Sequence, residues 1–186
     1  MVLQRNKYDA SYFGDVIESG GTRHEAGYSD YLELHTDWKA KESIKKFLTR
    51  HNIPKTAKVL ELGAGVGFMG KIATEEGYTD WTCVDWSNWA KRHEVYPVTE
   101  EDGLVFLQAQ TDNAFDYIVS RAFLECIPSN QLQNYATEGK RVATNHIHTT
   151  FLSANTQYYE IKTIPDWATD FLNDPNIIIE DYRKDG

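Results

Sequence analysis

Residues 58–70 constrain the fold of this chain more than any other stretch. They read K-V-L-E-L-G-A-G-V-G-F-M-G, an apolar run that contains one acid and leads directly into a glycine-rich turn. The run predicts a buried strand, and glycines after a strand allow positive φ and close approach of a ligand to the main chain. Backbone N–H groups of the turn and of the next helix then face that ligand. The stretch therefore predicts the first strand of an α/β sheet with a nucleotide-type ligand at its carboxyl end.

The spacing of the glycines fits two kinds of ligand site. Gly63, Gly65 and Gly67 form G-x-G-x-G. Gly65, Gly67 and Gly70 also satisfy G-x-G-x-x-G, the pattern of dinucleotide-binding turns. The glycines alone do not decide between the two. Glu61, two residues before the first glycine, is the stronger discriminator, and it has to be weighed together with the motifs that follow.

Further motifs follow in order along the chain. Residues 81–85 form a second strand-like run that ends in Asp85, about 20 residues after the glycine turn, where a carboxylate can accept both ribose hydroxyls. Residues 115–120 read F-D-Y-I-V-S, and residues 121–128 continue R-A-F-L-E-C-I-P. Together with the V-L-E-L-G-x-G-x-G turn, these motifs resemble the class I S-adenosylmethionine (SAM)-dependent methyltransferases. The resemblance covers roughly residues 30–182.

The resemblance implies a cofactor, a reaction and roles for several residues. It implies that SAM donates its methyl group to an acceptor by direct displacement, leaving S-adenosylhomocysteine (SAH). It implies that Glu61 positions the cationic methionine end, that Asp85 binds the ribose, and that Trp86 lies against the adenine. Asp102 resembles the acid that contacts the adenine amino group, although a helix-start residue favoured by the dipole explains it equally well. The expected cofactor-binding residues are Glu61, Gly63, Ala64, Gly65, Gly67, Asp85, Trp86, Asp102, Ser120 and Tyr12.

Polar residues on or after the strands at 115–120 and 144–152 are candidates for the acceptor side, because ligands of open α/β sheets bind beyond the carboxyl ends of the strands. They are Ser120, Arg121, Glu125, His146 and His148, of which we predict Arg121, Glu125 and His146 as catalytic. Arg121 either holds a substrate carboxylate or phosphate or forms a surface ion pair. Glu125 is either a general base or a residue that orients a loop. His146 either accepts a proton or is a hydrogen-bonded strand residue. No metal is expected, because the histidines lack Cys, Asp or Glu partners at ligand spacing.

Hydrophobic periodicity along the chain predicts a Rossmann-like α/β fold. We expect a doubly wound, mostly parallel sheet of six or seven strands with helices on both faces. Strands are expected near 57–62, 80–85, 94–98, 115–120, 144–152 and 176–180, and helices near 30–52, 66–76, 88–93, 101–111, 130–141 and from Pro165 onward. Either residues 157–161 add a strand, or the sheet is trimmed at its C-terminal end.

The chain length of 186 residues favours one domain, which we place at residues 30–186. Residues 1–29 precede it and are rich in aromatic residues and glycine. The aromatic content argues against simple disorder. Two interpretations remain open for this N-terminal segment: a lid that closes over the cofactor and the substrate pocket, or a wrap that packs on the sheet edge.

Composition limits the partners. A net charge of −9 makes a nucleic-acid partner unlikely, because that needs a basic face. No apolar stretch reaches the ~18 residues of a membrane span, and no signal-peptide pattern follows Met1, so we expect a cytoplasmic protein without a membrane partner. Two cysteines form no disulfide framework. The strand at 115–120 does not end in the N/D-P-P-Y/F signature of enzymes that methylate nucleic-acid bases, which favours a small-molecule acceptor.

Two alternatives to a methyltransferase remain. The first is a SAM-binding protein of the same fold that transfers no methyl group and has a regulatory or accessory role. The second is a nicotinamide-dependent oxidoreductase, which the overlapping Gly65, Gly67 and Gly70 pattern would support. Oligomeric state is left open between monomer and homodimer.

Overall fold

A six-stranded parallel sheet forms the centre of the protein. The structure is a computed structural model that describes residues 8–22, 28–34, 36–150 and 174–181. The strands are β1 Lys58–Leu62, β2 Asp80–Asp85, β3 Val98–Glu100, β4 Phe115–Arg121, β5 Ala143–Thr150 and β6 Ile177–Asp181. Their order is β3-β2-β1-β4-β5-β6, and each neighbouring pair runs parallel. The predicted doubly wound α/β fold is therefore confirmed.

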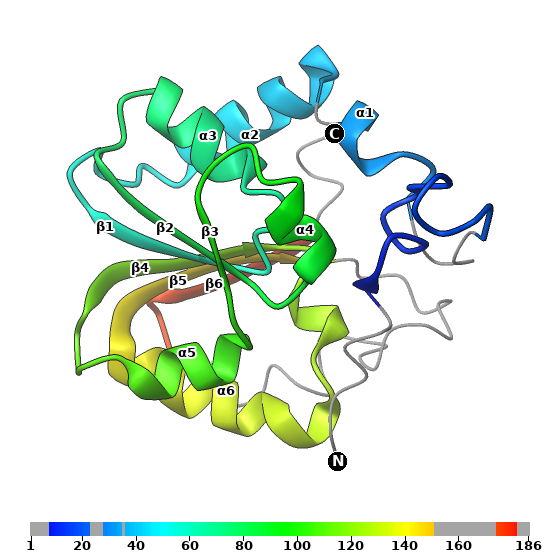
Figure 1. The fold of residues 1–186 in the computed structure, drawn as a ribbon. Helices are drawn as coiled ribbons and strands as arrows, with labels where there is room; N and C mark the ends of the chain where they lie inside the picture. Colours follow the sequence, from blue (N-terminus) through cyan, green and yellow to red (C-terminus); the bar gives the residue numbers. More distant parts are fainter. Residues whose placement is uncertain (1–7, 23–27, 35, 151–173, 182–186) are drawn as a thin grey trace.

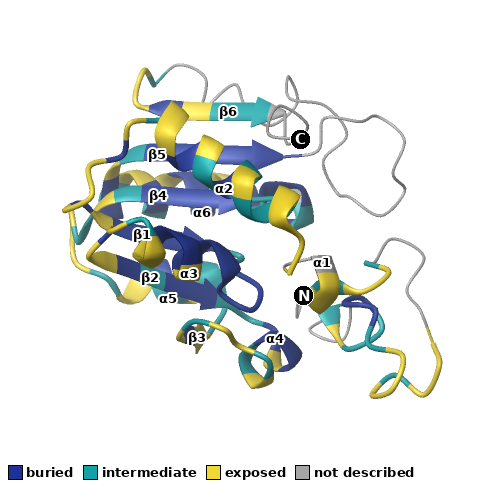
Figure 2. Cartoon of the chain, turned by 90° about the horizontal axis from the view of Figure 1, so that it is seen from above, coloured by how far each residue is buried: buried dark blue, intermediate teal, exposed yellow. Residues whose placement is uncertain are grey.

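Helices cover both faces of the sheet (Figure 1). Helices α2 Trp38–Arg50 and α3 Phe68–Glu75 lie on one face, and α5 Gly103–Ala109 and α6 Ser129–Val142 lie on the other. Successive strand residues point to opposite faces. Val59 packs in the core with α2 and α3, for example, and Leu60 packs in the core with α5 and α6. Both faces are thus buried, which explains the near-continuous apolar strands. Figure 2 shows the buried residues concentrated along the sheet.

The single helix expected over residues 30–52 is wrong, because the structure divides this stretch in two. A short helix α1 spans Tyr31–Leu34, and α2 begins at Trp38. The division falls at Asp37, whose backbone is extended and whose side chain accepts a hydrogen bond from the Lys39 N–H. Aspartate is favoured at such a cap because its carboxylate satisfies an N–H group that the first turn leaves unpaired. The apolar periodicity continues through the cap and so conceals it.

The third strand lies later than the predicted 94–98. It spans Val98–Glu100, directly after Pro97, which has no N–H to donate to a sheet ladder. The preceding residues cross over the start of α3. Tyr96 lies against the glycine turn there, and its hydroxyl donates to the Trp81 carbonyl at 3.2 Å. A short helix α4, Asn88–Arg92, joins β2 to this crossing segment.

Beyond β4, a 3-10 helix η2 at Leu124–Cys126 leads into α6. The strand β6 then pairs parallel with β5, from His146 opposite Ile177 to Thr150 opposite Asp181. The expected strand at 157–161 and the helix from Pro165 lie outside the described residues. Cys83 and Cys126 are free thiols. Within the described parts of the chain, no helix is long and apolar enough to cross a membrane.

Candidate functional site

A cleft opens at the carboxyl ends of four adjacent strands, β3, β2, β1 and β4. The space between its walls is about 790 Å³, and this figure includes solvent at the open mouth. The sheet order reverses between β1 and β4, since the chain winds outward through β2 and β3 on one side and through β5 and β6 on the other. Ligands of open α/β sheets bind at such a switch point. The cleft therefore lies where the topology places a ligand.

The glycine turn after β1 forms one wall of the cleft. Gly63, Gly65 and Gly67 have φ values of 69°, 55° and 79°, in the left-handed region that favours glycine. Gly63 and Gly65 line the cleft. Gly67 does not, because the Tyr96 carbonyl oxygen lies 2.8 Å from the place a Cβ would take. Gly63 and Gly65 are approached by the side chains of Phe123 and Tyr31, whereas Gly67 is covered by backbone. Ala64, between them, is buried.

Asp85 and Trp86, after β2, form the next part of the cleft. The Asp85 carboxylate accepts hydrogen bonds from the Gly65 N–H and the Ser87 N–H, both at 2.8 Å. Burial raises the pKa of this carboxyl, and the two N–H donors oppose that rise. Asp85 therefore ties the glycine turn to the end of β2 while it lines the cleft.

Asp102 lies at the far end of the cleft, after β3, and is the N-cap of α5. Its Oδ1 accepts from the Leu104 N–H at 2.9 Å and from the Val105 N–H at 3.2 Å. These hydrogen bonds show that Asp102 caps the start of α5, as one of its two interpretations expected. Because Asp102 also lines the cleft, a ligand contact is compatible with the same position.

Glu61 does not line the cleft. Its side chain is buried between the sheet and the helix layer, where Oε2 accepts from the Trp81 Nε1–H at 2.8 Å and from the Cys83 thiol at 3.3 Å. Burial raises the pKa of Glu61 to about 7, and these two donors and the nearby Arg121 guanidinium limit the rise. The folded protein therefore ionises this carboxyl at a higher pH than an exposed glutamate ionises.

Aromatic residues of the N-terminal segment, together with Tyr31 of α1, form the opposite wall. Tyr8, Tyr12, Phe13, Tyr28 and Tyr31 all line the cleft. Their rings pack edge-to-face on one another, with centroid distances of 4.7 Å for Tyr8–Tyr12 and 4.6 Å for Tyr28–Tyr31. Tyr8 also approaches Trp86 at 5.4 Å, and the Tyr31 ring lies over Gly65. Only Tyr12 was among the predicted site residues; the clustering of aromatic residues among glycines was the available signal for the others.

Contacts with α4 hold this wall in place. The Phe13 ring stacks on Trp89 at 4.4 Å, and His93 stacks on Trp89 at 4.3 Å. Arg92 donates to both carboxylate oxygens of Glu18, at 3.0 and 2.9 Å. The described part of residues 1–29 is thus anchored on α4 and lines the cleft.

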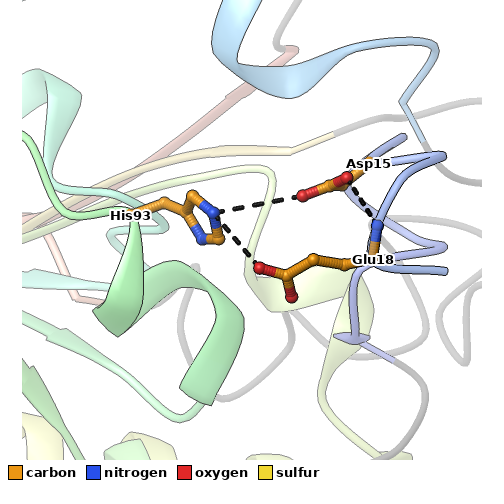
Figure 3. A group of neighbouring side chains, drawn as sticks. All are labelled: Asp15, Glu18 and His93. Atoms are coloured by element: carbon orange, nitrogen blue, oxygen red, sulfur yellow. Dashed lines mark hydrogen bonds and ion pairs between the residues drawn. The ribbon is translucent and has the colours of Figure 1, made fainter.

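Figure 3 shows Asp15, Glu18 and His93 beside this contact. His93 Nε2 lies 3.5 Å from Glu18 Oε1 and 4.0 Å from Asp15 Oδ2. Two carboxylates and an imidazole at such distances can bind a metal ion. Here the Trp89 Nε1–H donates to Asp15 at 3.1 Å, and Arg92 already pairs with Glu18. The three side chains therefore belong to the contact that holds the N-terminal segment on α4.

The structure brings one of the three predicted catalytic residues to the cleft. Arg121 lines it. Glu125 is buried and its Oε2 accepts from the Thr150 hydroxyl at 2.6 Å. His146 is buried beside α6, with Nε2 3.2 Å from the Ala143 carbonyl. Burial lowers the pKa of His146. Neither Glu125 nor His146 is among the residues that line the cleft.

Ser120 and His148 form a buried pair instead of lining the cleft. Ser120 Oγ lies 2.8 Å from His148 Nδ1, and burial lowers the pKa of His148 well below its ordinary value. The two residues face each other across β4 and β5. This hydrogen bond joins the two strands on the α6 side of the sheet.

Ala122 and Phe123, which the sequence analysis did not single out, complete the cleft after β4. Ala122 has a φ of 53°, which is rare for a residue with a Cβ, and its N–H donates to the Thr149 carbonyl at 2.8 Å. This turn carries Phe123 against Gly63. Strained backbone of this kind gathers at ligand sites.

No protein-family model matches the chain, and neither does any curated protein. A solved structure of a SAM-dependent methyltransferase from Archaeoglobus fulgidus is similar, with a TM-score of 0.51 and 19% identity over 66% of this chain and 54% of that protein. A SAM-dependent methyltransferase from Bacteroides fragilis in complex with S-adenosyl-L-homocysteine aligns with a TM-score of 0.40 and 16% identity, over 54% of this chain and 42% of that one. The chain spans about half the length of these structures. Its fold is the Rossmann-like fold of the class I SAM-dependent methyltransferases.

Proposed function

We propose that the chain binds SAM in the cleft and transfers its methyl group to a small-molecule acceptor. One observation carries the proposal: Gly63 and Gly65 face the cleft at the β1/β4 switch point, and Asp85 holds the turn from the end of β2. In this proposal Asp85 binds the ribose, Trp86 and Asp102 bind the adenine, and Gly63 and Gly65 let the methionine end approach the backbone. The fold is consistent with this assignment but does not by itself specify it.

The covering of Gly67 argues against a dinucleotide. In the G-x-G-x-x-G pattern, the second glycine lets a pyrophosphate approach the backbone at the helix start. Gly67 would have that place here, and the Tyr96 backbone covers it. A pyrophosphate would have to displace the segment that leads into β3. A nicotinamide-dependent oxidoreductase is therefore disfavoured.

SAM supplies a sulfonium methyl group that transfers by direct displacement, and the chain's task is to align the acceptor and exclude water. The aromatic wall from Tyr8 to Tyr31 and the turn at Phe123 provide the apolar surfaces that do both. Such a lined cleft suits a small molecule better than a polymer. Asp85, already fixed by two N–H groups, presents its remaining lone pairs to hydroxyl groups.

A SAM-binding protein that transfers no methyl group remains the second candidate. It is favoured by one specific observation, since the predicted proton acceptors Glu125 and His146 are both buried away from the cleft. Release of SAH from SAM with any acceptor would exclude it. A methyltransferase for an acceptor that needs no protein base would lack such side chains in its cleft as well.

Calorimetric titration with SAM, SAH and NAD tests the proposal. We expect the wild type to bind SAM and SAH and not NAD. Asp85→Asn should weaken SAH binding about 10- to 100-fold, since hydrogen bonds to charged groups contribute about 1.5–3 kcal/mol. Asp80→Asn is the matched control, because Asp80 is exposed at the opposite end of the same strand. Binding of NAD in place of SAH, or equal SAH binding by both variants, would contradict the assignment.

A further inference from the structure

Arg121 differs in charge from every other ionisable residue that lines the cleft. Among the described residues it is the only cation there, whereas Asp85, Glu101 and Asp102 are acids. The chain as a whole carries a net charge of −9. A single guanidinium in an acidic cleft determines where the negatively charged part of a ligand can lie, because anions are repelled elsewhere in the cleft.

The guanidinium is held in place by α2. Its Nη2 donates to the Ser43 hydroxyl at 2.8 Å, and its Cζ lies 6.0 Å from the centroid of the Phe47 ring. Phe47 is fully buried, so the ring is a fixed support. Arg121 itself is the last residue of β4, paired with Thr149 of β5. A planar group fixed in this way is suited to bidentate binding of a carboxylate or a phosphate.

The position of Arg121 separates it from the proposed adenosine-binding residues. Asp85 and Trp86 follow β2, and Asp102 follows β3, whereas Arg121 ends β4 on the other side of β1. Neighbouring strands lie about 4.8 Å apart, so β4 is about 10 Å from β2 and about 14 Å from β3. The tyrosine rings of the N-terminal wall complete the cleft beyond the strand ends. Arg121 thus lies at the β4 end of the cleft, which the proposed adenosine site does not occupy and which is available to the acceptor.

We propose that Arg121 binds an oxyanion of the acceptor, so that the methyl acceptor is a small molecule that carries a carboxylate or a phosphate and has an apolar body. This rests on the proposed function, since it assumes that SAM fills the β1–β3 end of the cleft. The guanidinium anchors the anionic group, and the aromatic wall covers the apolar part. Arg121 is a binding residue in this proposal, and Ser43 is a positioning residue that acts through it.

The cofactor carries a carboxylate too, and the experiment has to separate the two sources. SAH has this carboxylate, whereas 5′-methylthioadenosine lacks the amino-acid part. We would measure the affinities of both for the wild type, Arg121→Gln, Arg121→Lys and the control Lys46→Gln. Lys46 is exposed on α2, so its replacement removes the same charge away from the cleft. Circular dichroism shows whether each variant is folded, and Arg121→Lys keeps the charge while it removes the planar fork.

The acceptor site is then probed on protein saturated with SAH. The probes are benzoate, phenyl phosphate and the neutral isostere benzamide. We expect one of the anions to bind at least about 10-fold more tightly than benzamide, as for a charge-assisted pair. Arg121→Gln should abolish this preference, Arg121→Lys should reduce it, and Lys46→Gln should retain it. The anion that binds more tightly identifies carboxylate or phosphate as the preferred group.

Three results would overturn the proposal, and each of them identifies a different reason for the failure. If Arg121→Gln weakens SAH but not 5′-methylthioadenosine, Arg121 binds the carboxylate of the cofactor. If neither anion is preferred over benzamide by the wild type, the cleft does not select an anionic acceptor. If the wild type does not bind SAH at all, the proposed function fails, and this inference fails with it. The proposal is supported if Arg121→Gln binds SAH as tightly as the wild type does but no longer prefers an anion over benzamide. Arg121 would then bind the acceptor and not the cofactor.

Discussion

Replacement of Glu61 by glutamine tests the electrostatics behind the glycine turn. The Glu61 side chain is buried, and burial raises its pKa from an ordinary value of 4.5 to about 7. The unfolded chain therefore ionises this carboxyl at a lower pH than the folded chain does. Stability is accordingly highest below the unfolded pKa, and it falls as the pH rises towards and through the folded value. Because one pKa unit corresponds to about 1.4 kcal/mol, the penalty at alkaline pH approaches roughly 3 kcal/mol.

Urea denaturation of the wild type and Glu61→Gln at about pH 5 and about pH 8.5 measures this penalty. We expect the free energy of unfolding of the variant, relative to the wild type, to rise by about 2–3 kcal/mol between the two pH values. The comparison across pH cancels any constant cost of the amide beside Trp81 and Cys83. Glu75→Gln, exposed on α3, is the control and should show a difference that does not change with pH. The same difference at both pH values for Glu61→Gln would refute the reasoning.

Three glycine and alanine substitutions test the backbone around the cleft. Ala122→Gly should stabilise the protein by about 0.5–1 kcal/mol in urea denaturation, because Ala122 has a φ of 53°; a loss of stability would show that the turn is unstrained. Gly70→Ala should cost about 1–3 kcal/mol in the same assay, because its Cβ would lie 2.7 Å from Cys83 Sγ; a neutral result would mean that α3 shifts freely. Gly65→Ala should weaken calorimetric binding of SAH, because Gly65 has a φ of 55° and an added Cβ would displace the Tyr31 hydroxyl from the cleft wall; unchanged binding would show that neither the φ nor this contact matters for SAH.

The sequence predicted the parts of the fold that depend on continuous apolar runs. The strands β1, β2 and β4 lie within one residue of their predicted bounds, because each is buried on both faces and is bounded by turn residues. The glycine turn follows from the same local signal. The boundary at Asp37 and the late start of β3 were missed, because a cap and a crossing segment depend on contacts that periodicity does not report.

The placement of polar residues could be predicted less well, for a physical reason. When a strand is buried on both faces, the sequence does not say which face a polar residue takes. Ser120 and Arg121 are neighbours on β4, yet one bonds to His148 on the α6 side and the other to Ser43 of α2. The alternation of residues along a strand shows that His146 and His148 point to the same face of the sheet. It does not show that this is the face that α6 covers. The strand order and the packed helices decide it.

The N-terminal segment and α4 meet through an aromatic stack and an ion pair, and the two differ in strength. Phe13 and Trp89 are 5% and 3% exposed, and their rings are nearly parallel. Removing a buried phenylalanine side chain costs about 3–5 kcal/mol. The pair between Glu18 and Arg92 is partly exposed, with relative exposures of 33% and 50%, so it contributes about 0.2–1 kcal/mol. The stack should therefore hold the segment on the fold.

This difference predicts unequal effects on the cofactor, because the same segment lines the cleft with Tyr8, Tyr12 and Tyr28. Phe13→Ala should weaken SAH binding at least about 10-fold and speed proteolysis of the segment, since the rings leave the wall when their anchor is lost. Glu18→Gln should weaken SAH binding less than about fivefold, as expected for an exposed pair, and less still in high salt. Equal effects of the two substitutions would contradict this ranking, because the ion pair would then position the wall as strongly as the stack does. No effect of either would mean that SAH binds without the wall, so that the segment contacts the acceptor alone or neither ligand.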